Sequence, residues 1–114
     1  MILRIWSAAL DPTQGEAYRR FEVERSLPML HRQPGFLGVF FLRTAEGGAA
    51  SITIWEDRGT VEALESSPSY RQEARELAES GLLAGAPPSV EILEVEGGDL
   101  RPEPLVGALA RPRH

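Results

Sequence analysis

Two side chains of one predicted helix have the right chemistry to remove a proton from a bound ligand. Glu24 and His31 are seven positions apart, so they lie on one helix face, close to the apolar residue Phe21. His31 changes charge near neutral pH, which suits it to general-base catalysis, and Glu24 and Phe21 would then line the substrate pocket. The alternative is structural, because a histidine at the C-terminus of a helix is also stabilised by the helix dipole.

Aromatic and arginine side chains offer the other groups that such chemistry needs. Trp6 and Trp55 lie on predicted strands, where an indole ring either stacks on a flat ligand or packs in a core or interface. Tyr70 either donates a hydrogen bond to a ligand oxygen or extends its hydroxyl to water. Arg43, like Arg4, interrupts an apolar strand. Either arginine stabilises a developing enolate or phenolate, or it pairs with an acid of a second subunit, for which the candidates are Glu56, Glu91 and Glu94.

Composition argues against several other functions. The 114 residues include 12 arginines, no lysine and 17 acidic residues, so the net charge is -5 and we expect no nucleic-acid binding. The chain has no cysteine, and Glu91, Glu94 and Glu96 are not spaced as metal ligands, so we expect neither a metal nor another cofactor. The start has no signal-peptide pattern, and no apolar run approaches the ~20 residues of a membrane helix. We therefore expect a cytoplasmic protein without membrane contact.

The elements that must position these residues repeat one pattern twice. An extended apolar run is followed by an amphipathic helix and a second extended run, and the series then recurs. The predicted strands and helices alternate along residues 2–10, 13–31, 36–44, 49–55, 60–80 and 90–95. This βαββαβ order predicts an α+β, ferredoxin-like fold, in which a four-stranded antiparallel sheet carries two helices on one face.

Local signals predict where the helices begin and break. Thr13 and Glu16 fit a capping box at the start of the first helix. Pro28 is expected to disturb the last turns of that helix. In the second helix, Ser67 as N-cap and Pro68 at the first helical position predict a break followed by a new start.

Both faces of the first two predicted strands are largely apolar. Two helices can cover only one face of such a sheet, so the other face needs a further cover. We predict a homodimer in which the two sheets pack face to face into an α+β barrel. Residues 1–97 form the predicted domain, and the Pro-rich tail 98–114 is predicted to be extended or partly disordered, or laid across the partner subunit.

Four short segments follow one another in a recognisable order and spacing. They are Gln33–Gly38 at the start of the second strand, Ile52–Asp57 at the end of the third, Val61–Leu64, and Ser67–Tyr70. Together they resemble the antibiotic biosynthesis monooxygenase (ABM) domain family of the dimeric α+β barrel superfamily. The resemblance covers about residues 1–97 and implies a pocket in each subunit, between the sheet and its two helices.

The resemblance also implies a range of activities. Family members include cofactor-free oxygenases of polycyclic phenols, quinol oxygenases and haem-degrading enzymes. The haem-degrading members rely on a histidine in the second helix, and residues 70–76 contain none, so we do not expect haem degradation. The expected function is a cofactor-independent monooxygenase of a small phenolic or quinol compound, with His31 as base, Tyr70 or Arg43 as donor, and Trp55 shaping the pocket. The alternative is a non-catalytic dimer that binds a small aromatic ligand or has a plugged pocket.

Overall fold

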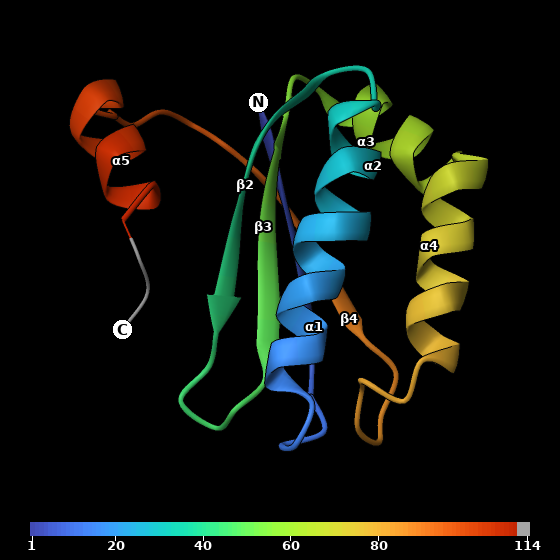
Figure 1. Cartoon of the computed structure of the whole chain (residues 1–114). Coiled ribbons are helices and arrows are strands. Elements are labelled where there is room, and N and C mark those ends of the chain that lie inside the picture. Colours follow the sequence, from blue (N-terminus) through green and yellow to red (C-terminus); the bar gives the residue numbers. More distant parts are fainter. Residues whose placement is uncertain (112–114) are drawn as a thin grey trace.

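The computed structural model describes residues 1–111 and places strands and helices in the predicted order (Figure 1). The elements are β1 (Ile2–Ala8), α1 (Gly15–Phe21), the π-helical turn η1 (Glu22–Ser26), α2 (Leu27–His31), β2 (Phe36–Arg43), β3 (Ala49–Trp55), α3 (Arg58–Ser66), α4 (Pro68–Glu79), β4 (Ser89–Glu94) and α5 (Pro102–Leu109). None of the helices in this range is long and apolar enough to cross a membrane.

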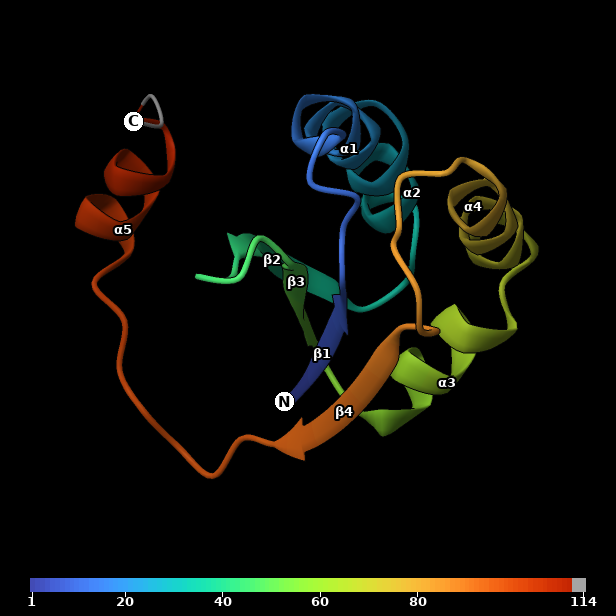
Figure 2. The ribbon, with the colours of Figure 1, turned by 90° about the horizontal axis from the view of Figure 1, so that it is seen from below.

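Within residues 1–111 the strands form one four-stranded sheet in the order β2-β3-β1-β4, and neighbouring strands are antiparallel. Ile5 on β1, for example, lies opposite Ile52 on β3 and Glu91 on β4. Figure 2 shows α1, α2, α3 and α4 on one side of the sheet and α5 on the other side. The predicted α+β, ferredoxin-like fold is therefore confirmed.

The helix-facing side of the sheet supports two clusters of buried side chains. One cluster consists of Ile2, Met29, Leu30, Trp55, Val61 and Leu64. The other consists of Leu10, Tyr18, Ala49, Leu77 and Leu82. Because alternate residues of a strand share a face, Ile2, Arg4 and Trp6 of β1 all point toward the helices. Arg4 and Trp6 thus lie in the space between the sheet and its helical layer.

The first helix begins without the predicted capping box. α1 starts at Gly15, and no side chain caps its N-terminus. Thr13 instead donates hydrogen bonds to Asp11 Oδ1 from its backbone N–H (2.9 Å) and from Oγ1 (2.7 Å). The prediction from Thr13 and Glu16 is wrong because Asp11 holds both donors of Thr13 in a turn ahead of the helix.

A π-helical turn, η1, interrupts the first helix between α1 and α2. Pro28 follows it in the first turn of α2. Pro28 has no N–H to donate to the carbonyl four residues earlier, so the helix is free to widen just before it. The disturbance predicted at Pro28 is therefore a widened turn, which changes the direction of the side chains that follow.

The second helical region breaks at the predicted position. α3 ends just before Ser67, whose side chain accepts a hydrogen bond from the backbone N–H of Tyr70 (3.5 Å). Pro68 occupies the first turn of α4, where its missing N–H costs no helical hydrogen bond. Both predicted features are confirmed, and this new start determines where Tyr70 and Glu73 point.

The sheet face away from α1–α4 is largely apolar. Strand alternation places on this face Leu3, Ile5, Phe40, Leu42, Ala50, Ile52, Ile54 and Leu93, together with the polar residues Ser7, Ser89 and Glu91 toward the β4 edge. Leu42 and Leu93 are exposed, at 40% and 42%. A largely apolar face of this extent is typical of an interaction surface.

The C-terminal tail contains a helix. Pro102 and Pro104 both lie in the first turn of α5, whose N–H groups have no partner within a helix, so neither proline interrupts it. The prediction of an extended or partly disordered tail is therefore wrong for Pro102–Leu109. Residues 112–114 of the predicted tail lie outside the described residues, and the domain boundary at residue 97 stays a prediction.

Candidate functional site

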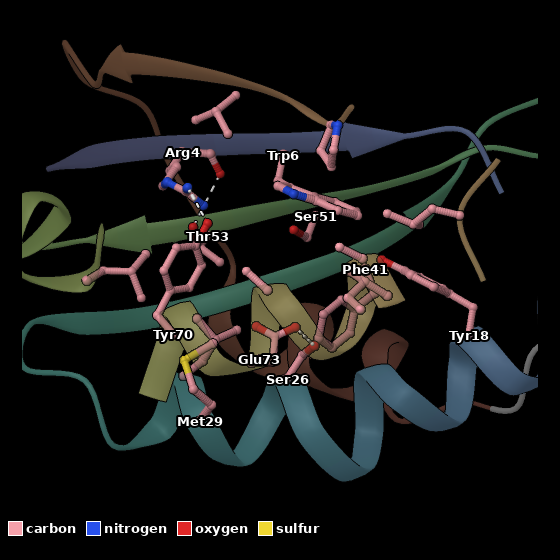
Figure 3. A pocket seen from close by; sticks show the side chains of 18 residues that line it. Arg4, Trp6, Tyr18, Ser26, Met29, Phe41, Ser51, Thr53, Tyr70 and Glu73 are labelled. Carbon is pink, nitrogen blue, oxygen red and sulfur yellow. Dashed lines mark hydrogen bonds between the residues drawn. The ribbon is translucent and has the colours of Figure 1, made fainter. Parts of the chain in front are cut away.

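A cavity of about 310 Å³ lies between the sheet and the helices that cover it (Figure 3). The strands contribute Arg4, Trp6, Phe41, Ser51, Thr53 and Val90. The helical segments contribute Tyr18, Ser26, Met29, Leu30, Leu64, Tyr70, Glu73 and Leu77. A mostly apolar lining with a few polar groups is typical of small-molecule sites, whose volumes begin at about 300 Å³.

The Arg4 triad consists of Arg4, Glu65 and Tyr70. Its arginine and its tyrosine provide hydrogen-bond donors at one end of the cavity. Arg4 is buried and donates from Nε to Glu65 Oε2 (3.1 Å) and from Nη2 to the Tyr70 hydroxyl (2.7 Å). Its guanidinium carbon also lies 5.2 Å from the centre of the Tyr70 ring. Because the Tyr70 oxygen accepts from Arg4, its own proton can be donated to a ligand. The pair can thus hold a ligand oxygen that carries negative charge.

A buried carboxyl group, Glu73, also lines the cavity. Ser26, the last residue of η1, donates from Oγ to Glu73 Oε1 at 3.2 Å. Burial raises the pKa of the Glu73 carboxyl, and the negative charge of Glu76 adds to the increase. The Ser26 hydrogen bond and the charges of Arg25 and Arg4 oppose it. A carboxylate of raised pKa in an apolar cavity is suited to take up a proton from a ligand and return it.

Solved structures share the fold of this chain, although no family model matches the sequence and no curated protein is significantly similar to it. A monooxygenase from the gene ActVA-Orf6 of Streptomyces coelicolor, in complex with Nanaomycin D, matches with a TM-score of 0.71 at 17% identity, covering 88% of this chain and 91% of that chain. SnoaB, a cofactor-independent oxygenase from Streptomyces nogalater, matches with a TM-score of 0.65 at 17% identity, and the match covers 85% of this chain and 94% of that chain. A structure described as an antibiotic biosynthesis monooxygenase matches with a TM-score of 0.67 at 12% identity, and the match covers 85% of this chain and 100% of that chain.

The chain has the fold of the antibiotic biosynthesis monooxygenases. This likeness confirms, at the level of the fold, the resemblance that the sequence segments indicate. At identities of 12% to 17% it does not carry residue roles from one chain to another, so the chemistry of this ABM fold must be argued from its own cavity.

A second group of the same composition, the Arg43 triad, consists of Arg43, Glu22 and Tyr18. Arg43 donates from Nη1 and Nη2 to the two carboxylate oxygens of Glu22, at 3.2 and 3.1 Å, and lies 4.9 Å from the centre of the Tyr18 ring. Arg43 is not part of the cavity wall. The ion pair predicted with a second subunit is thus replaced by one within the chain. Burial, with the nearby Glu22 charge, raises the pKa of Tyr18, so its hydroxyl stays protonated.

The two tryptophans have different surroundings in the ABM fold. Trp6 lines the cavity, and its ring stacks on Tyr18 with centroids 6.4 Å apart and planes at 7°. Trp55 is fully buried outside the cavity wall, against Phe36 at 5.6 Å. Its indole N–H donates to Thr53 Oγ1 (2.8 Å). Trp55 therefore belongs to the core, in contrast to its predicted role in shaping the pocket.

The structure places His31, Glu24 and Phe21 away from the cavity. His31 is exposed, and its ring edge contacts Phe36 with centroids 5.3 Å apart. Glu24 lines a second groove, which shares Met29 and Glu73 with the cavity, and Phe21 packs beside the cluster that contains Tyr18. For Glu24 and His31 the physical reason is η1, because its wider turn changes the helix phase between these two residues. The expected His31 base is thus not supported by its position.

Glu73 and Arg4 are the functional candidates that the sequence analysis missed or undervalued. Glu73 follows Tyr70 by three positions and precedes Leu77 by four, so it lies on the apolar stripe of its helix. A carboxyl group on such a stripe is itself a signal of a buried ionisable site. Arg4 interrupts a strand between Ile2 and Trp6, which is the corresponding signal in the sheet.

Proposed function

We propose that the protein is a cofactor-independent monooxygenase of a small phenol or quinol, with Glu73 as the general base in place of His31. One observation carries the proposal: a buried carboxyl group and the Arg4–Tyr70 donor pair face the same largely apolar cavity of about 310 Å³. The fold shared with SnoaB, described as a cofactor-independent oxygenase, supports this choice of chemistry.

The reaction begins with proton transfer from the substrate. The Glu73 carboxylate takes the phenolic proton, and the resulting phenolate oxygen lies against Arg4 and Tyr70. The positive charge and the hydroxyl donor stabilise the phenolate more than the neutral phenol, so they favour ionisation. The aromatic walls formed by Trp6 and Phe41 hold the ring and keep water from it.

Molecular oxygen then reacts with the electron-rich ring. The phenolate gives one electron to O₂, and the two radicals combine at a ring carbon that bears hydrogen, forming a peroxide. Glu73 returns the phenolic proton to the peroxide anion and so becomes a carboxylate again. It then removes the hydrogen of that carbon as a proton, the C–H pair forms the new C=O bond, and the O–O bond breaks. The hydroxide that leaves takes up a proton and departs as water. One oxygen atom stays in the quinone product, and the substrate supplies all the electrons.

Oxygen uptake tests the proposal. With a panel of phenols and quinols, Glu73→Gln should lower the rate at least about 100-fold, because glutamine keeps the shape but cannot accept the proton. Glu79→Gln is the matched control, since Glu79 lies on the same helix and is exposed. Equal uptake by the wild type and Glu73→Gln would remove Glu73 as the base. Tight binding of a phenol without uptake would instead favour a non-catalytic ligand-binding protein.

A second copy of the chain is the proposed cover for the apolar sheet face. The outward residues Ile5, Phe40 and Ile52 come from three adjacent strands and form its centre. α5 lies on the same side of the sheet, and its Val106 and Leu109 are 64% and 57% exposed (Figure 2). In a dimer the two sheets cover each other, and α5 packs against the partner subunit, which removes both apolar surfaces from water.

Analytical ultracentrifugation tests this proposal, because it measures whether the chain is a dimer or a monomer in solution. Ile52→Glu places a charge at the centre of the apolar face and should convert a micromolar dimer to monomer. Ala45→Glu adds the same charge in the exposed β2–β3 hairpin and should leave the dimer intact. A chain ending at Gly98 should dimerise more weakly, because it lacks α5. A wild-type monomer at these concentrations would contradict the proposed assembly.

A further inference from the structure

We propose a second activity for the same cavity, the oxygen-independent enolisation of a small planar ketone that forms a conjugated enolate. The inference rests on the proposed site but not on its reaction with oxygen. Glu73 removes a proton from the carbon beside the carbonyl group, and the Arg4–Tyr70 pair holds the carbonyl oxygen. The substrate class is a planar ketone in which an acidic C–H bond lies between the C=O group and an aromatic ring or a C=C bond.

The base is already held in position. Ser26 donates to Oε1 of Glu73 at 3.2 Å, which leaves Oε2 to take a proton. Figure 3 shows Glu73 and Ser26 on the helix side of the cavity, with Tyr70 on the same side and Trp6 on the sheet. A planar ligand between the two layers would present one face to Trp6 and the other to Glu73, so the carboxylate would lie above the plane, where a C–H bond beside the carbonyl group can align with the π system.

The donors are also held before a ligand arrives. Glu65 accepts from Nε of Arg4 at 3.1 Å, so the other end of the guanidinium is directed at the Tyr70 hydroxyl, 2.7 Å away. A carbonyl oxygen beside this pair meets a positive charge and a hydroxyl donor together. Donors positioned in this way stabilise the charge of an enolate more than the neutral ketone. A carboxylate base combined with such donors is a sufficient set for proton transfer at carbon.

The proton and electron balance needs no other reactant. The C–H bond breaks, its electron pair forms the C=C bond of the enolate, and the C=O pair moves to oxygen. The proton rests on Oε2 of Glu73 and then returns to the same carbon or to the far end of the conjugated system. The first outcome is hydrogen exchange and the second is a double-bond shift. Burial raises the pKa of Glu73, which favours the protonated form that returns the proton.

Hydrogen–deuterium exchange under nitrogen tests the inference. With 2-tetralone in D₂O, NMR follows loss of the benzylic C–H signal next to the carbonyl group. The wild type should exchange it at least about 100-fold faster than Glu73→Gln, and at least about tenfold faster than Tyr70→Phe. Glu79→Gln should match the wild type. Circular dichroism checks that each variant is folded. If Glu73→Gln does not fold, Tyr70→Phe still tests the inference, because it keeps the packed ring and removes only the hydroxyl group.

Binding of 2-naphthol, a planar analogue of the enol, gives a readout that does not depend on turnover. Calorimetry should show weaker binding to Tyr70→Phe than to the wild type, because the hydroxyl donor is lost. Exchange without oxygen uptake in air would support the inference and reject the monooxygenase. Oxygen uptake with no protein-dependent exchange would do the reverse. Exchange that is equal in the wild type and Glu73→Gln would overturn the inference.

Discussion

The Arg4 triad and the Arg43 triad contain the same residue types in the same arrangement. In each, an arginine on a strand lies over the ring of a helical tyrosine, at 5.2 Å for Arg4 and 4.9 Å for Arg43, and pairs with a helical glutamate. The glutamates differ. Glu65 is 39% exposed and takes one hydrogen bond from Arg4, whereas the Glu22 side chain is 4% exposed and takes two from Arg43.

This difference separates a binding group from a structural one. Arg43 directs two donors at a buried carboxylate that neutralises its charge, so little of that charge can act on a ligand. Arg4 faces the partly hydrated carboxylate of Glu65, and water weakens the attraction between these two charges. The other donors of Arg4 point at Tyr70 and the cavity. The same residue types therefore stabilise the fold in one place and can bind a ligand in the other.

The largest effect should come from breaking the buried ion pair of the Arg43 triad. Arg43→Gln leaves the Glu22 carboxylate without its arginine and should lower the free energy of unfolding by about 3 kcal/mol. Glu65→Gln in the Arg4 triad should cost at most about 1 kcal/mol, because that pair is partly exposed. Urea denaturation compares the two variants. Equal losses would mean that exposure of the glutamate does not distinguish the triads.

The tyrosines provide a sharper test of which triad acts on a ligand. Tyr70→Phe removes the hydroxyl that accepts from Arg4 and should reduce oxygen uptake about 10-fold to 100-fold. Tyr18→Phe should change uptake less than about threefold, since the ring that stacks on Trp6 remains. Uptake and thermal stability are measured on both variants. A greater loss of uptake in Tyr18→Phe would reverse the roles assigned to the two ends of the cavity.

A smaller effect should appear in the pH dependence of stability. The folded-state pKa of Glu73 is raised above its ordinary value of 4.5, so its stabilising contribution is complete below that value and is lost as pH rises through the raised pKa. Glu73→Gln should therefore melt a few degrees above the wild type at pH 7, and the two should converge toward pH 4. The facing groups Ser26, Glu76, Arg25 and Arg4 stay unchanged in this comparison. A lower melting temperature for Glu73→Gln at pH 7 would contradict the raised pKa.

Much of the fold could be predicted because its signals are local. The order of strands and helices follows from apolar periodicity, and the break at Ser67 and Pro68 follows from the preferences of N-caps and first turns. The helix in the tail differs from the prediction because proline disfavours a helix only beyond its first turn, and Pro102 and Pro104 both lie where no helical N–H is required.

The site was only partly predictable. Trp6 and Tyr70 belong to the cavity wall, whereas His31, Glu24, Phe21, Trp55 and Arg43 do not. His31 and Glu24 were assigned by regular helical spacing, which fails across the π-helical turn at Glu22–Ser26. Trp55 and Arg43 lie on the correct face of the sheet, but that face extends past the cavity into the core. Strand alternation predicts on which face of the sheet a side chain lies, but it does not predict whether that side chain reaches the cavity or the core.

The sequence by itself determined the elements and their layers, since periodicity and caps act over a few residues and are written in the chain. Only the tertiary structure decided which charged groups meet. Arg4 reaches Tyr70 across 66 positions, and Ser26 reaches Glu73 across 47. Such contacts depend on the phase of a helix relative to a sheet, and one widened turn is enough to change it. The chemistry assigned to this cavity therefore depends on packing that no local pattern specifies.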